Sequence, residues 1–93
     1  MLVTILRRRW NLLFVPQRSL GPKVEGKCDD PSTPSKTIQV SRSLTGERRL
    51  DVLIHEMLHA ADWHKDEEWI STVASDIARA LWRQGYRGPN DVA

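Results

Sequence analysis

The hydrophobic periodicity of this chain changes near Ser41, and that change limits the possible folds more than any other feature. Before Ser41, apolar residues occupy every second position in two short segments, 10–15 (Trp10, Leu12 and Phe14) and 37–41 (Ile38 and Val40), which is typical of β-strands with one buried face. After Ser41, apolar residues recur at helical spacing as far as about residue 84. Because strands precede helices, we expect an α+β fold, with a small two- to three-stranded sheet packed on a helical hairpin.

Two amphipathic helices are predicted in the second half. The first should run from about Gly46 to about Trp63. The second should follow Asp66, a favourable N-cap residue, and end before Gly85, which suits the position just after a helix. Only a few residues separate them, so we expect an antiparallel hairpin that turns near His64.

The remaining segments are richer in turn residues. Residues 16–36 contain most of the proline and glycine of the first half and are predicted to be a long loop, with room for a short strand at 24–28. Residues 86–93 read as a tail. The sequence therefore predicts a single domain over residues 1–93 with its core in 37–84.

A chain of 93 residues with one cysteine, Cys28, can form no internal disulfide. A domain of this size therefore needs another source of stability, such as a bound metal. A single free thiol also favours a reducing compartment, and we expect a cytoplasmic protein. No uncharged apolar run is long enough to cross a bilayer, so we expect no membrane partner.

The charges are distributed unevenly along the chain. Residues 1–50 carry ten Lys or Arg and four Asp or Glu, whereas residues 51–93 carry four and eight. The basic residues are scattered through strand and loop segments and match no nucleic-acid-binding motif, so the sequence disfavours a nucleic-acid partner. It does not indicate the oligomeric state.

The strongest local signal is His55-Glu56-Met57-Leu58-His59, an H-E-x-x-H motif within the first predicted helix. Residues four apart on a helix are about 40° apart around its axis, so both imidazoles can reach one Zn²⁺ ion. Glu56 is then placed to hold a metal-bound water instead of the metal itself. The motif predicts a zinc site with Glu56 as its catalytic carboxylate.

A catalytic zinc site needs a third protein ligand. In an antiparallel hairpin, Glu67 and His59 each lie about one turn from the connection and at a similar height, so helical geometry favours Glu67. His64, Glu68 and Asp62 remain alternatives.

His55, Glu56 and His59 with a downstream glutamate resemble the zincin metallopeptidases, specifically the gluzincin branch, and the small size resembles minigluzincins and small phage or bacterial H-E-x-x-H proteins. The resemblance covers about residues 37–84. It implies that His55, His59 and Glu67 bind zinc and that Glu56 is the general base. It also implies a location in the cytoplasm of a bacterial or phage-infected cell.

The activity implied by this resemblance is hydrolysis of a peptide or protein substrate, with Glu56 activating the zinc-bound water. His64 or Tyr86 is the expected oxyanion stabiliser, and an extended peptide could pair with the strand at 37–41, taken as an edge strand. The alternative is a catalytically silent zincin-like metal-binding domain that acts as a protein-interaction module. No role is predicted for Cys28 beyond that of a half-buried free thiol.

Overall fold

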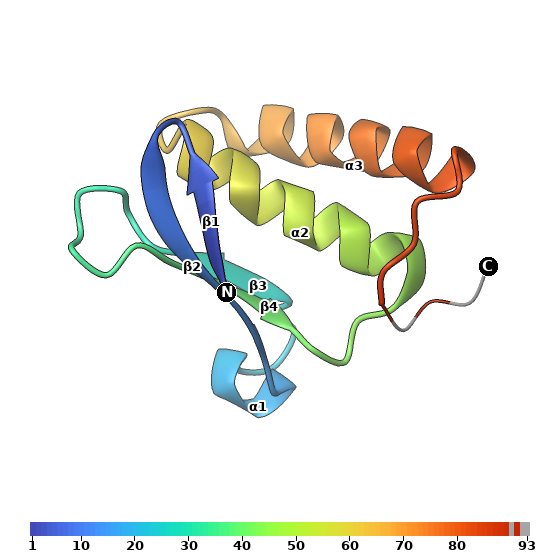
Figure 1. Cartoon of the computed structure of the whole chain (residues 1–93), viewed down its shortest axis with the longest axis horizontal. Helices are drawn as coiled ribbons and strands as arrows, with labels where there is room; N and C mark the ends of the chain where they lie inside the picture. The colour runs from blue at the N-terminus through green and yellow to red at the C-terminus, as the bar shows by residue number, and fades with distance from the viewer. Residues whose placement is uncertain (90, 92–93) are drawn as a thin grey trace.

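A four-stranded mixed sheet, a pair of packed helices and one short helix make up the structure, a computed structural model that describes residues 1–89 and 91 (Figure 1). The expected α+β class is confirmed. The elements in chain order are β1 (Leu2–Ile5), β2 (Arg8–Val15), α1 (Gln17–Leu20), β3 (Gly26–Cys28), β4 (Thr37–Ser41), α2 (Gly46–Ala61) and α3 (Glu67–Arg83). The spatial order of the strands is β1-β2-β4-β3.

The sheet has one strand more than the two or three expected. The additional strand is β1, which pairs antiparallel with β2 from Leu2 opposite Asn11 to Ile5 opposite Arg8. The turn between them places Leu6 and Arg7 at positive φ, 48° and 66°, where hairpins usually have glycine or asparagine. The sequence lacks that turn signal, which is why the hairpin escaped prediction.

The edge of the sheet also differs from expectation. β4 lies inside the sheet, parallel to β2 on one side and antiparallel to β3 on the other. The prediction that residues 37–41 form an edge strand open to a peptide is therefore wrong, and β3 forms that edge instead. Residues 16–36, predicted to be a long loop, contain a helix, α1, and a strand, β3. The short strand expected in this segment is confirmed at 26–28, whereas the helix at 17–20 was not predicted.

The core lies between the sheet and α2. It is built from Trp10, Leu12, Ile38 and Val40 of the central strands together with Val52 and Ala60 of α2. α3 packs on α2 and buries Ile70, Ala74 and Ala78. α2 thus contacts the sheet with one side and α3 with another, and Figure 1 shows the two helices running alongside each other.

The ends of the helices follow the sequence signals closely. α2 ends at Ala61, two residues before the expected end. The Asp66 carboxylate caps α3 by accepting a hydrogen bond of 3.2 Å from the Trp69 N–H, and Gly85 adopts a φ of 94° just after the helix.

Within residues 1–89 and 91, none of the helices α1, α2 and α3 combines the length and the apolar character needed to cross a bilayer.

The packing of α3 on α2 can be tested with one substitution at two positions. Ile70 is fully buried, whereas Ile77 on the same helix is 39% exposed. We expect Ile70→Ala to lower the free energy of unfolding by about 2–5 kcal/mol because it leaves a cavity between the helices. Ile77→Ala is the matched control and should change it by less than about 1 kcal/mol in denaturant unfolding. Equal effects of the two substitutions would contradict this packing.

Candidate metal centre

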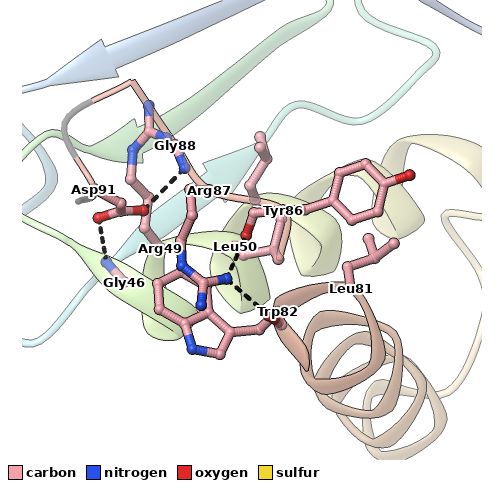
Figure 2. A pocket seen from close by; sticks show the side chains of 10 residues that line it. Gly46, Arg49, Leu50, Leu81, Trp82, Tyr86, Arg87, Gly88 and Asp91 are labelled. Carbon is pink, nitrogen blue, oxygen red and sulfur yellow. Dashed lines mark hydrogen bonds between the residues drawn. The ribbon is translucent and has the colours of Figure 1, made fainter. Parts of the chain in front are cut away.

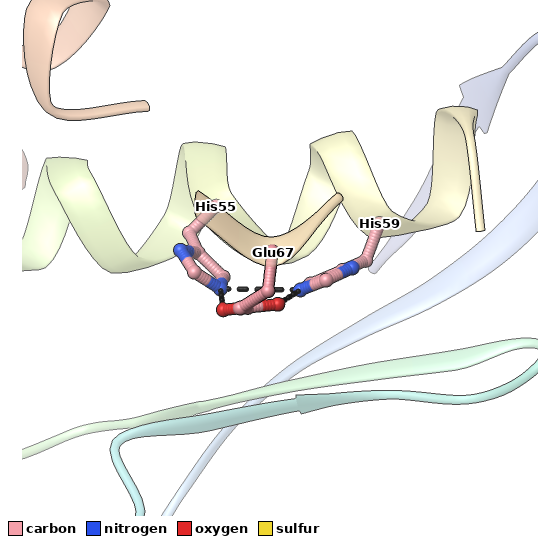
Figure 3. A group of neighbouring side chains, drawn as sticks. All are labelled: His55, His59 and Glu67. Carbon is pink, nitrogen blue, oxygen red and sulfur yellow. Dashed lines mark hydrogen bonds and ion pairs between the residues drawn. The ribbon is translucent and has the colours of Figure 1, made fainter. Parts of the chain in front are cut away.

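Three side chains from two helices converge on one point. His55 and His59 lie one turn apart on α2, and Glu67 is the first residue of α3 (Figure 3). The Nε2 atoms of His55 and His59 are 3.2 Å apart. Glu67 Oε1 lies 2.9 Å from His55 Nε2, and Glu67 Oε2 lies 2.8 Å from His59 Nε2. The potential ligand atoms of all three lie within 4.8 Å of one another.

The short connection between the helices brings Glu67 to this position. α2 ends as the Asp62 N–H donates to the Leu58 carbonyl, and a tight turn follows in which the Lys65 N–H donates to the Asp62 carbonyl. Asp66 then caps α3, so that Glu67 begins the returning helix. Farther along the pair, the Ser75 hydroxyl donates a 2.7 Å hydrogen bond to Asp51 and joins the two helices again.

The other third-ligand alternatives lie outside this cluster. Among the residues that the structure describes, His55, His59 and Glu67 are the only group of three or more His, Cys, Asp or Glu side chains placed to share an ion. His64 and Asp62 instead line a cavity with Asp30 at the end of α2. Glu68 follows Glu67 on α3 and is exposed. The structure therefore brings together the three residues that the sequence favoured as ligands.

Glu56, the predicted general base, is only 8% exposed although it carries a carboxyl group. It faces the edge strand, where a Cβ built on Gly26 would lie 2.9 Å from both its Cγ and its Oε2. Burial, with a smaller contribution from the negative charge of Glu67, raises the pKa of Glu56 to about 7. A carboxyl group with such a pKa can both accept and release a proton near neutral pH.

Two cavities flank the cluster along α2. One, of about 320 Å³, lies between the segment that leads into β3 and the middle of α2 and includes His55 and Glu56. The other, of about 360 Å³, lies between Arg8, the loop at 30–32 and residues 60–64 at the end of α2. An elongated ligand that follows α2 past the cluster would thus find a cavity on either side.

A third cavity, of about 250 Å³, is more apolar and lies at the far end of the helix pair (Figure 2). Leu50, Leu81, Trp82 and Tyr86 contribute to its lining. Glu67 begins α3 and Tyr86 follows its end, and a 17-residue helix spans about 25 Å. The expectation that Tyr86 stabilises an oxyanion is therefore wrong, which leaves His64 as the remaining candidate.

Cys28 is a half-buried free thiol, as expected. Its burial, together with the charges of Glu56 and Asp29, raises the pKa of the thiol to about 12. The thiol is consequently protonated at neutral pH, and its Sγ donates a weak hydrogen bond to the Asp29 carbonyl.

Sequence reasoning missed the close approach of β3 to Glu56. Gly26 lies in the segment 16–36 among proline, serine and other glycine residues, where a glycine is typical of a turn. The close contact of Gly26 with α2 involves Glu56, which is 30 positions later in the chain. A local sequence pattern cannot predict a contact between residues so far apart.

Comparison with known proteins identifies no relative of this chain: no protein-family model matches it, and neither a curated protein nor a solved structure does. The function is therefore inferred from the residues of the site themselves.

The raised pKa of Glu56 predicts a pH-dependent stability in the metal-free protein. Because burial favours the protonated carboxyl, the folded chain binds more protons than the unfolded chain between about pH 4.5 and pH 7, and its stability falls as the pH rises through that window. Glu56→Gln removes this titration. From about pH 5 to about pH 8, the wild type should lose up to about 3 kcal/mol of unfolding free energy relative to Glu56→Gln. Denaturant unfolding in the presence of a chelator measures this difference, and parallel pH profiles would contradict the burial of an ionisable Glu56.

Proposed function

We propose that this protein is a zinc-dependent peptidase in which His55, His59 and Glu67 hold the ion and Glu56 is the general base. The observation that carries the proposal is the convergence of two imidazoles and a carboxylate from separate helices, with ligand atoms within 4.8 Å of one another. A buried carboxyl group next to the first of these histidines in the chain provides the second half of the catalytic arrangement.

The donor set suits zinc better than the common hard cations. Zinc sites use neutral imidazole nitrogen together with carboxylate oxygen, whereas calcium and magnesium need oxygen ligands almost throughout. Three protein ligands leave one position free for reaction, as in catalytic zinc sites. The Glu67 side chain is 64% exposed, so the cluster is open to solvent and to a substrate.

Zinc bound here would supply a Lewis acid for a substrate carbonyl and would lower the pKa of an attacking water. The protein's own part is the movement of protons. Glu56 accepts the proton of the attacking water and delivers it to the leaving amine, which requires a carboxyl group that titrates near the working pH. A cation held by His55 and His59 favours the ionised form of Glu56, the form that accepts a proton.

The proposed substrate is an extended peptide. β3 is an edge strand of the sheet that contacts α2, and it has an outer edge with which a peptide backbone can pair. The cavities before and after the cluster offer room for side chains on both sides of the bond to be cut. The cavities are small and open, so the proposal favours a flexible peptide over a folded protein as substrate.

The alternative proposal is a catalytically silent metal-binding domain that serves protein interaction. The apolar cavity at the far end of the helices favours it, because Leu81, Trp82 and Tyr86 there could accept a partner's side chain (Figure 2). Both proposals share the metal ligands, so the role of Glu56 separates them.

The assignment of the third ligand is tested by zinc titration of two neighbouring variants. Glu67→Ala should weaken zinc binding by at least about 100-fold, because loss of a mere ligand-orienting residue already weakens metal sites by about 10–100-fold. Glu68→Ala is the matched control, also an exposed glutamate in the first turn of α3, and should bind zinc as the wild type does. Full affinity in Glu67→Ala, or a large loss in Glu68→Ala, would refute the assignment.

The catalytic role of Glu56 is tested by Glu56→Gln on a quenched fluorescent peptide library. We expect kcat to fall by about 10²–10⁴-fold, the usual contribution of a general base, while zinc affinity stays unchanged. Hydrolysis that is equally fast in wild type and Glu56→Gln would contradict the role of Glu56. A zinc-loaded wild type that cleaves no member of the library would favour the silent binding domain.

A further inference from the structure

We infer that Gly26 is a positioning residue for the general base Glu56, an inference that rests on the proposed peptidase function. Gly26 opens β3, and a Cβ placed on it would lie 2.9 Å from Cγ and from Oε2 of Glu56. It would also lie 3.0 Å from Cγ1 of Val52, one turn earlier on α2. Only glycine lets the edge strand approach the helix this closely.

The need for glycine at this position is one of space and not of backbone conformation. The glycines with positive φ are Gly21, Gly46 and Gly85, and Gly26 is not among them. An alanine could therefore adopt the backbone conformation of Gly26, and its methyl group would meet Glu56 and Val52 first. The three nearest atoms include no atom of the proposed metal ligands.

The strand has little freedom to move away from the helix. Gly26 pairs with Val40 of β4, and the Ser41 N–H donates a 2.9 Å hydrogen bond to the carbonyl of Glu25, the preceding residue. The Glu25 carboxylate also accepts hydrogen bonds from Nε of Arg48 on α2, at 3.1 and 3.2 Å. β3 is thus held both to the sheet and to α2.

Because the strand is held, the flexible Glu56 side chain is the part that yields to a substituent at position 26. Glu56 is only 8% exposed, and a Cβ on residue 26 would come within 2.9 Å of both its Cγ and its Oε2, so the side chain has to shift to make room. A general base must lie within hydrogen-bond reach of the proton it accepts. A displacement of about 1 Å can lower the rate by up to about 100-fold.

The main experiment compares Gly26→Ala with the wild type. We expect Gly26→Ala to lower kcat by about 10–100-fold while KM changes by less than about threefold and zinc affinity stays unchanged. Thr4→Ala is the control, since Thr4 lies on β1, the edge strand at the opposite side of the sheet, and its side chain is exposed, and it should retain the wild-type kcat. If Gly26→Ala alone fails to fold, kcat is measured instead on Gly26→Ala combined with Val52→Ala. The second substitution removes the close contact with Val52 and keeps the close contact with Glu56.

A double-mutant cycle separates positioning from general disruption. In a Glu56→Gln background the base is already absent, so adding Gly26→Ala should lower the residual rate no further. An equal loss in both backgrounds, a loss of zinc affinity, or an unchanged kcat in Gly26→Ala would each overturn the inference.

A readout independent of activity comes from NMR of the zinc-free protein. Nuclear Overhauser contacts between the Gly26 Hα and the Glu56 Hγ protons are expected in the wild type, and their absence would overturn the inference. Failure of the proposed function looks different. If the wild type shows these contacts and binds zinc but hydrolyses no peptide, the peptidase proposal falls and takes the catalytic role of Gly26 with it. If the wild type hydrolyses peptide and Gly26→Ala does so equally well, only the inference about Gly26 falls.

Discussion

The packing of α3 against α2 is the interaction on which the rest of the structure depends. Ala74 and Ala78 are fully buried in this contact, and such small residues let two helices approach closely along their length. With so short a connection between them, the start of α3 returns beside the end of α2, and Glu67 lies between His55 and His59. The proposed metal centre is therefore a product of helix packing, and an ion there would in turn cross-link the two helices.

The electrostatics of Glu56 depend on whether the proposed metal centre is occupied. Glu56 is buried without an ion-pair partner among the described residues, and the nearby negative charge of Glu67 raises its pKa further. A divalent ion held by His55, His59 and Glu67 would offset the negative charge of Glu67 that acts on Glu56. The same ion would give so small a domain the additional stability that its single cysteine cannot provide.

Features that follow from local spacing could be predicted from the sequence. The four-residue separation of His55 and His59 placed both on one helix face, and the cap at Asp66 located the start of α3 closely enough to favour Glu67. Features that depend on distant contacts could not. The hairpin turn at Leu6 has no glycine, the edge position of β3 depends on a parallel pairing of β2 with β4, and the contact of Gly26 with Glu56 spans two elements. Tyr86 follows the end of α3 and so lies about one helix length from Glu67, too far to act at the site.

Zinc K-edge X-ray absorption of the protein loaded with one equivalent of zinc tests the central proposal most directly, because it reports the ligands themselves. We expect two imidazole nitrogens at about 2.0–2.1 Å and a carboxylate oxygen at about 2.0–2.2 Å, in agreement with His55, His59 and Glu67. Glu67→Ala should lose the carboxylate contribution and keep both imidazoles. A shell with three imidazoles, which would bring in His64, or one of oxygen ligands alone, would contradict the proposed centre.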